Sequence, residues 1–366
     1  MVSASKPTVA LPRRSYVGSE GRRTPRARPA TLTPGQKLGA WKVEQELGRG
    51  GMGAVYAVTH RGFGKRAALK LCHASVLNAQ YTPETFLREA RVVHLVNHPG
   101  VCDVFSTGSY DHRPYLAMER LVGITLGDHL DRSALSHAEA IEVLVELCEV
   151  LASAHAAGVV HRDLKLDNVF LLDKPTPAGR QVKLLDWGVA RIVGEADPMV
   201  GMIAGTLTYM APEQARGEDI TPAADVYSLA VLAYQLLLGG APFRSPDDRE
   251  IIDQHLTAEP PRPTSRWAEI PPALDGVLVA MLAKLPSDRP TITSVLGVLR
   301  ACRATSASAS IDTVSIFEHL RALPKVPAVD AFGRPAPVYA VARTNLVRAS
   351  VAIVAVLASV MSLLGG

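Results

Sequence analysis

Cysteine is scarce in this sequence. The 366 residues include only four cysteines, and none of their spacings is the CxxC or similar pattern of a metal site. Three lie inside apolar segments, where a thiol behaves as a small hydrophobic side chain. The pattern excludes a disulfide framework and favours a reducing cytosol for the folded part of the chain. The four residues are Cys72, Cys102, Cys148 and Cys302.

Acidic residues and apolar runs are nearly absent from residues 1–36. This stretch contains seven Lys or Arg residues, five prolines and a single acid, Glu20. It lacks the apolar core of a secretory signal, and its only aromatic residue is Tyr16, which argues against specific nucleic-acid binding. We expect a disordered basic tail over residues 1–36, either simply solvated or loosely attracted to an anionic membrane surface.

Internal repeats of 20–50 residues are also absent, which argues against a repeat architecture. The length of the chain and its apolar fraction of 48% allow two lobes with tails, and the net charge of +4 is mild. We expect a folded region over residues 41–302. Residues 303–345, with Ser, Ala and Pro, are expected to form a linker with a possible short helix around residues 311–320.

The end of the chain lacks charge altogether. Residues 349–366 contain no charged side chain, and as a helix they would span about 27 Å of a hydrocarbon core of roughly 30 Å. Arg343 and Arg348 flank the N-terminal side of this stretch, which would place that side in the cytoplasm. We expect residues 346–366 to form a single transmembrane helix; a helix packed against protein is the alternative.

The folded region changes character along its length. Short β-prone runs at Lys42–Leu47, Ala54–Thr59 and Arg66–Cys72 are joined by glycine turns. A helix is expected after Pro83, and apolar residues recur at helical spacing over residues 141–152 and 226–237. The sequence therefore predicts a small β-rich lobe followed by a helical lobe.

Four glycines follow the first predicted strand, and three of them form a recognisable pattern. Gly48, Gly50 and Gly53 fit the pattern G-x-G-x-x-G-x-V, which ends at Val55. A dinucleotide site needs a helix to begin at such glycines, whereas here a second strand follows. The context favours a hairpin flap whose backbone amides can approach phosphates, although glycines can also form a turn without a ligand.

Lys70 lies in an apolar strand, where an ammonium group needs an anionic partner. Glu89, on the helix that follows, is a candidate for that partner. Together they would hold the ammonium against the α- and β-phosphates of a nucleotide. For either residue alone, a purely structural ion pair is the alternative.

The most informative segment is His161–Asn168, which reads HRDLKLDN. It resembles the H-R-D-L-x-x-x-N catalytic loop of protein kinases, and the D-F-G and A-P-E motifs follow in order as DWG at 186–188 and APE at 211–213. The sequences of residues 47–56 and 205–213 are similar to the corresponding segments of bacterial Hanks-type serine/threonine kinases. The resemblance covers the folded region, and it implies an α+β, two-lobed protein kinase fold, to which the chain adds the C-terminal apolar helix.

The resemblance also implies roles in phosphoryl transfer, which depends mainly on positioning and charge neutralisation. Asp163 would accept or orient the proton of the substrate hydroxyl, and Lys165 would neutralise the moving phosphoryl group. Asn168 and Asp186 would bind Mg²⁺, which prefers hard oxygen ligands. Lys165 and Thr206 together indicate specificity for Ser and Thr rather than Tyr.

By the same resemblance the cleft would bind ATP. The adenine would lie between Val55 and Ala68 on one side and Phe170 on the other, bonded to the backbone at Glu119 and Leu121. The residues implied in nucleotide binding are Leu47, Gly48, Gly50, Gly53, Val55, Ala68, Lys70, Glu89, Met118, Glu119, Leu121 and Phe170.

Two further features concern the helical lobe. The resemblance implies a structural ion pair between Glu213 and Arg289. Trp187 replaces the usual Phe of the D-F-G motif, and its larger indole ring brings an N–H group that needs a partner. We expect this to be a tolerated exchange of one aromatic residue for another.

The activation segment lacks hydroxyl side chains. No Ser, Thr or Tyr occurs between Val189 and Gly205, the stretch in which the family usually carries a phosphate that pairs with Arg162. We hypothesise that Glu195 or Asp197 supplies the negative charge, so that no phosphorylation upstream of Thr206 is needed. Ordering of the segment by a partner is the alternative.

These observations predict a Ser/Thr protein kinase that uses Mg·ATP, acts on protein hydroxyls and is tethered to a membrane. A pseudokinase scaffold is the alternative, and it is disfavoured because the charged catalytic set is complete. A small-molecule kinase is disfavoured by residues 205–213, with Asp225 and Arg289, which resemble a platform for peptide substrates.

Overall fold

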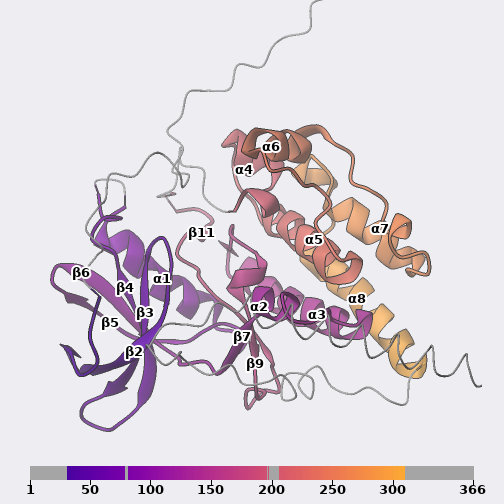
Figure 1. Ribbon diagram of the computed structural model, residues 1–366. Helices are drawn as coiled ribbons and strands as arrows, with labels where there is room; N and C mark the ends of the chain where they lie inside the picture. The colour runs from indigo at the N-terminus through magenta and orange to yellow at the C-terminus, as the bar shows by residue number, and fades with distance from the viewer. Residues whose placement is uncertain (1–30, 79–80, 196, 198–205, 310–366) are drawn as a thin grey trace, which may run out of the picture. The chain divides into compact units, whose positions relative to one another are not determined.

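The computed structural model describes residues 31–78, 81–195, 197 and 206–309, which form a β-rich and a helical lobe (Figure 1). The β-rich lobe is a six-stranded antiparallel sheet in the order β1-β2-β3-β4-β6-β5, and α1 packs against β5 and β6. Its elements are β1 (Lys37–Leu38), β2 (Trp41–Arg49), β3 (Gly53–His60), β4 (Arg66–Cys72), α1 (Pro83–Val96), β5 (Val104–Tyr110) and β6 (Arg113–Met118).

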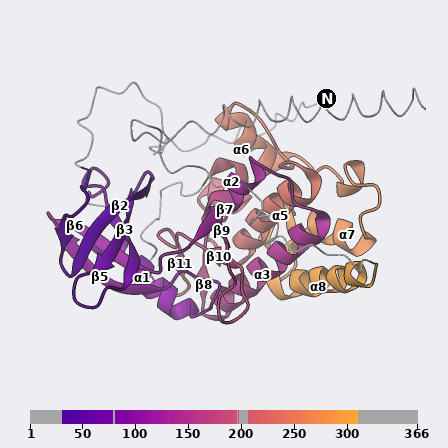
Figure 2. The same cartoon turned by 60° about the horizontal axis from the view of Figure 1, so that its bottom comes forward.

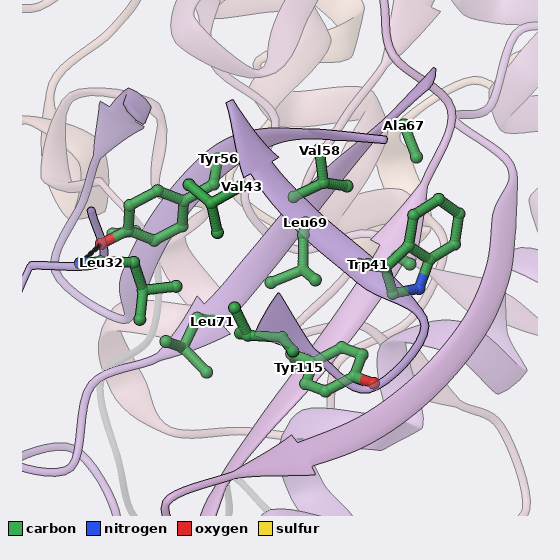
Figure 3. Packing of buried hydrophobic residues seen from close by; sticks show 12 residues of the cluster. Leu32, Trp41, Val43, Tyr56, Val58, Ala67, Leu69, Leu71 and Tyr115 are labelled. Atoms are coloured by element: carbon green, nitrogen blue, oxygen red, sulfur yellow. Dashed lines mark hydrogen bonds between the residues drawn. The ribbon is translucent and has the colours of Figure 1, made fainter. Parts of the chain in front are cut away.

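Strand β4 separates the core of this lobe from the cleft. Because successive side chains of a strand point to opposite faces, Leu69 and Leu71 join the hydrophobic cluster that includes Tyr56 (Figure 3). Ala68 and Lys70 point to the other face, where both line a cavity. One strand thus packs the lobe and presents a lysine to the cleft.

Residues that precede the predicted domain pack against the hydrophobic cluster of the sheet. Leu32 belongs to the same cluster and is 4% exposed, and its backbone N–H donates to the Tyr56 hydroxyl at 3.3 Å. The Thr31 hydroxyl accepts a hydrogen bond from Arg49 at 3.1 Å. The prediction of a disordered tail is therefore wrong for residues 31–36, because burial of one leucine and these contacts order the segment. Residues 1–30 lie outside the described part of the chain.

Helix α1 begins and ends with local capping. The Thr82 hydroxyl accepts the backbone N–H of Thr85 at 3.3 Å, and Pro83 occupies the first turn, where its missing N–H costs nothing. Asn97 terminates the helix in a left-handed conformation with φ of 42°. The start predicted from Pro83 is confirmed.

The helical lobe is organised around α5, of which 13 of the 16 residues are buried. Helices α3 and α7 contact it, and α3 lies beside α8 (Figure 2). This confirms the helix predicted from the apolar spacing over residues 226–237. The helices are α2 (Leu126–Leu130), α3 (His137–Ala156), α4 (Pro212–Arg216), α5 (Ala223–Leu238), α6 (Asp248–Thr257), α7 (Pro272–Met281) and α8 (Ile292–Ala309).

Short strands frame the segments between the lobes. A three-stranded sheet in the order β10-β9-β7 flanks residues 161–168, the predicted catalytic loop, and β11 pairs antiparallel with β8 just before those residues. The short elements are β7 (Gly123–Thr125), β8 (Val159–Val160), β9 (Val169–Leu172), β10 (Val182–Leu184), β11 (Arg191–Ile192) and the 3-10 turns η1 (Leu166–Asn168), η2 (Leu207–Tyr209), η3 (Pro263–Ser265) and η4 (Pro286–Asp288).

The C-terminal boundary differs from the expected one. Helix α8 continues to Ala309, so residues 303–309 belong to the helical lobe and not to a linker. The rest of the predicted linker, its possible short helix and the predicted transmembrane helix at 346–366 lie outside the described residues. Within residues 31–309, as far as they are described, no helix has both the length and the apolar character needed to cross a bilayer.

Candidate active site

A cavity of about 350 Å³ opens between the two lobes. Both lobes contribute predicted residues to its wall: Leu47, Gly48, Val55, Ala68, Lys70, Glu89, Met118, Glu119, Leu121, Asn168, Phe170 and Asp186. Gly50 and Gly53 do not line it; they form the hairpin turn above, where the Gly50 N–H donates to the Gly53 carbonyl at 2.9 Å. Gly53 admits no side chain, since a Cβ would lie 2.4 Å from the Leu71 carbonyl oxygen.

Five residues of the cavity wall were not predicted. They are apolar or aromatic neighbours that only the tertiary fold brings to the site: Val93, Cys102, Val104, Leu185 and Trp187. Val93 is four residues after Glu89 on α1, so helical spacing could have indicated it. Leu185 and Trp187 flank Asp186, so the motif at 186–188 could also have indicated them. Cys102 and Val104 carry no comparable signal for cavity lining, because buried apolar residues of this kind are common throughout the chain.

Lys70 is the centre of a charged cluster in the cavity. Its Nζ donates to Glu89 and to Asp186, each at 2.8 Å. Burial disfavours the ammonium ion, but the carboxylates of Asp186 and Glu89 outweigh burial and raise the pKa of Lys70. The ammonium in turn lowers the pKa of Asp186, whereas burial raises the pKa of Glu89. Lys70 therefore stays charged, and Asp186 presents an ionised oxygen to the cleft.

The predicted catalytic residues also come together. Lys165 Nζ donates to Asp163 Oδ2 at 2.7 Å and to the Thr206 hydroxyl at 3.2 Å. The Thr206 backbone N–H donates to Asp163 Oδ1 at 3.1 Å. The amide of Asn168 donates to the Asp163 backbone carbonyl at 2.7 Å and to Oδ2 at 3.1 Å. Lys165 and Thr206, which are 41 positions apart in the sequence, thus both contact the carboxylate of Asp163.

Asp225, at the start of α5, anchors the predicted catalytic loop through hydrogen bonds to its backbone. It is fully buried, and it accepts the backbone N–H groups of His161 and Arg162 at 2.9 Å each and His155 Nε2 at 2.8 Å. Burial alone would raise the pKa of Asp225, but the hydrogen bond from His155 and these other contacts lower it. Arg162 is held with a positive φ of 71°, a conformation that a non-glycine residue keeps only where its surroundings fix it.

The indole ring of Trp187 has a complete set of partners. The side chain is 1% exposed, its Nε1–H donates to the Leu184 carbonyl at 3.3 Å, and the ring meets His161 edge to face at 4.6 Å. The N–H group that an indole brings is therefore satisfied inside the fold. This supports the interpretation of Trp187 as a tolerated replacement.

Arg162 forms a bidentate pair with Asp197. Its two terminal nitrogens donate to the two carboxylate oxygens at 2.9 and 2.5 Å. Of the two acids suggested by the sequence, Asp197 is the one that faces Arg162. Glu195 instead contacts helix α1.

The ion pair predicted in the helical lobe is present. Arg289 donates to both carboxylate oxygens of Glu213, at 2.6 and 2.8 Å, and both side chains are buried. Neither residue lines the cavity between the lobes. The geometry of the pair confirms the structural tie.

The donor set of the cleft fits one kind of metal site. Asp186 and Asn168, the predicted metal ligands, both line the cavity, and each side chain carries oxygen atoms of the kind that bind hard cations. In the described ranges, no group of three or more His, Cys, Asp or Glu side chains converges as a metal cage. Two oxygen ligands suit Mg²⁺, which commonly takes its remaining ligands from substrate phosphates and water.

Comparison with known proteins agrees with this geometry. Residues 41–298 match the family described as the protein kinase domain. The chain is 38% identical over 292 residues to serine/threonine-protein kinase Pkn1 of Myxococcus xanthus, covering 78% of this chain and 41% of that protein. It is 35% identical over 258 residues to serine/threonine-protein kinase PknA of Mycobacterium tuberculosis, covering 69% of this chain and 58% of the relative.

A solved structure gives the same result. The crystal structure of the Mycobacterium tuberculosis PknI kinase domain superimposes with a TM-score of 0.58 at 27% identity, covering 74% of this chain and 99% of that one. The chain spans less than two thirds of the length of the curated relatives named above. The family match extends over most of the chain and includes every site residue described here, so the chain belongs to the protein kinase domain family.

Proposed function

We propose that this kinase is catalytically active and transfers the γ-phosphoryl group of ATP to serine and threonine hydroxyls of proteins. The observation that carries the proposal is the joint contact of Asp163 with Lys165 and Thr206. A scaffold that only bound nucleotide would have no use for a carboxylate, an ammonium and a hydroxyl held at hydrogen-bond distance. The relatives named as serine/threonine kinases support the same specificity.

Each group has a role that its chemistry suits. Asp163 orients the substrate hydroxyl and accepts its proton, while Lys165 neutralises charge on the transferred group. Lys70, kept charged by Glu89 and Asp186, binds nucleotide phosphates. Mg²⁺ would be held by Asn168 and Asp186 and would neutralise phosphate charge.

The walls of the cavity suit an adenine ring. Val55, Ala68, Phe170 and Met118 all line the cavity. We assign Val55 and Ala68 to one face of the ring, Phe170 to the other face and Met118 to the back of the pocket. Backbone groups at Glu119 and Leu121 supply the polar edge. The Glu119 N–H already donates to the Asp103 backbone carbonyl at 2.8 Å, so the Glu119 carbonyl is the group that we assign to the base.

Asp197 supports a second part of the proposal, namely that activity requires no phosphorylation upstream of Thr206. The carboxylate already occupies the position on Arg162 that a phosphate would take. We expect the protein to retain its activity after phosphatase treatment. A large loss of activity, with recovery through a phosphate on Thr206 or Thr208, would contradict this part.

We also propose that residues 346–366 tether the kinase to a membrane. The support is the uncharged stretch 349–366 with Arg343 and Arg348 before it. Deletion of residues 349–366 is expected to move the protein from the membrane fraction to the supernatant. The same distribution with and without the stretch would reject the tether and leave the kinase proposal intact.

The principal test is transfer from labelled ATP with Mg²⁺ to a generic protein substrate, using the full chain beside Asp163→Asn. We expect label on serine or threonine and a fall in kcat of about 10²–10⁴-fold in the variant, with ATP still bound. Nucleotide binding without transfer by the unchanged protein, or label in the variant equal to that in the unchanged protein, would overturn the proposal.

A further inference from the structure

Helix α1 is joined to the activation segment by a three-membered charged cluster. Glu195 accepts hydrogen bonds from both terminal nitrogens of Arg91, at 2.6 and 3.0 Å, and Arg88 Nη2 lies 3.4 Å from the same carboxylate. The Arg88 side chain is 16% exposed and that of Arg91 is 60% exposed. More than 100 positions in sequence separate the two arginines from their shared acid.

Glu195 is fixed to the helical lobe on both sides. Before it, β11 pairs with β8, and the Val193 N–H donates to the Gly158 carbonyl at 2.8 Å. Two residues after it, Asp197 forms the bidentate pair with Arg162. The carboxylate of Glu195 is therefore an anchor that belongs to the helical lobe and faces the other lobe.

The arginines that bind this anchor share their helix with Glu89. Arg88 and Arg91 are three positions apart and so lie on one face of α1, and Glu89 follows Arg88 directly. The Glu89 carboxylate reaches the other way, to Lys70 at 2.8 Å. Because a helix moves nearly as one body, a force that holds Arg88 and Arg91 also sets the distance from Glu89 to Lys70.

We propose that Glu195 is a positioning residue for phosphoryl transfer, acting through Arg91 and Arg88 to keep α1 seated and Glu89 on Lys70. The inference rests on the proposed kinase activity. The link uses a carboxylate that is part of the chain, as the Arg162 link does, so it forms without any modification. The two acids have separate roles. Asp197 fixes the activation segment to the catalytic loop, and Glu195 connects the fixed segment to α1 in the β-rich lobe.

An isolated surface ion pair would have little effect on stability, so the test must measure position. We would compare full-length Glu195→Gln and Arg91→Gln with Glu142→Gln, a control in the pair that Glu142 forms with Arg303 at 3.3 Å on exposed faces of α3 and α8. We expect kcat to fall about tenfold in the first two variants, and the melting temperature to change little. The double variant Glu195→Gln/Arg91→Gln should be no worse than Glu195→Gln, since both changes break one link.

Amide hydrogen exchange provides a readout that is independent of catalysis. Glu195→Gln should speed exchange in α1, residues 83–96, whereas Glu142→Gln should leave α1 as in the unchanged protein. Equal kcat and equal α1 exchange in Glu195→Gln and Glu142→Gln, with an active parent, would overturn the inference. Faster α1 exchange with an inactive parent would reject the kinase proposal while keeping the mechanical link.

Discussion

The two lobes hold the charged groups of the cleft in different ways. In the helical lobe Asp163 is set by the loop that Asp225 anchors through two backbone N–H groups, and all of these residues belong to that lobe. In the β-rich lobe Lys70 pairs with Glu89 of α1 and with Asp186, which follows β10 and lies outside that lobe. One half of the site is thus built from inside its own lobe, and the other half depends on contacts from outside.

Burial accounts for the difference. Asp225 is completely inaccessible to solvent, and removing a partner from such a group leaves a buried charge or dipole without compensation. The contacts that steady α1 lie nearer to solvent, where ion pairs are weaker and more easily exchanged. The helical lobe therefore presents a preformed half-site, while the Lys70 half is complete only when α1 is in place.

The largest effect should come from the buried pair of the helical lobe. Glu213→Gln would leave the Arg289 charge in the interior without its anion, and we expect a loss of about 3–5 kcal/mol in the free energy of unfolding. Denaturant unfolding measures it. The matched change Glu142→Gln, in an exposed pair, should cost no more than about 1 kcal/mol. An equal loss of unfolding free energy in Glu213→Gln and Glu142→Gln would contradict the conclusion that the helical lobe depends on its buried charged groups.

The second-largest effect should come from the protonation of His255 in the helical lobe, which lowers the free energy of unfolding. Burial lowers the pKa of His255 to about 4, so between pH 6.5 and 4 the unfolded chain binds a proton that the folded chain excludes. Stability is therefore complete above pH 6.5 and falls as the pH drops through this window, by up to about 3 kcal/mol. Unfolding measured across the window should show the slope, and His255→Gln should flatten it. If the dependence of stability on pH is the same in His255→Gln as in the unchanged protein, other groups are responsible for it.

The β-rich lobe should respond to its covering segment. Leu32→Ala removes a nearly buried side chain from the sheet cluster and should cost about 2 kcal/mol. Thr33→Ala changes an exposed neighbour whose backbone N–H still donates to the Gln36 side-chain Oε1 at 3.0 Å, so it should stay within about 0.5 kcal/mol. Thermal unfolding of the full chain distinguishes them, and similar values for both variants would show that residues 31–36 contribute no packing.

The smallest effect is expected between the lobes. Trp187→Phe loses the hydrogen bond to the Leu184 carbonyl, which is worth about 1 kcal/mol of stability. Because the ring would stay in its pocket, kcat should remain within about threefold of the parent value. A loss of activity beyond tenfold would show that the indole sets the position of Asp186, making this segment part of the catalytic support.

Much of the site could be predicted because its chemistry lies in short motifs. Lys70, Asp163 and Asp186 each lie in a short sequence motif that can be recognised without any knowledge of the fold. The pair of Glu213 and Arg289 was also expected from the family pattern, although the two residues are 76 positions apart. Their roles in catalysis stay predictions that the proposed assays address.

The rest depends on contacts that no local pattern encodes. Leu32 is one leucine among polar residues and prolines, so nothing in its neighbourhood distinguishes an ordered segment from a tail. Arg91 is a charged residue on a helix surface and looks like any solvated side chain. The sequence offered Glu195 and Asp197 equally for Arg162, and only the path of the backbone after β11 separates them.

Cys102 in the cavity wall has a consequence for chemical probes. A thiol beside a nucleotide pocket is an obvious point of attack for electrophilic inhibitors, which react with the thiolate form. Burial raises the pKa of Cys102 to about 12, and its Sγ lies 3.6 Å from the Glu119 carbonyl. At neutral pH almost none of it is ionised. Acrylamide or chloroacetamide analogues of adenine should therefore occupy the pocket reversibly and leave this cysteine unlabelled.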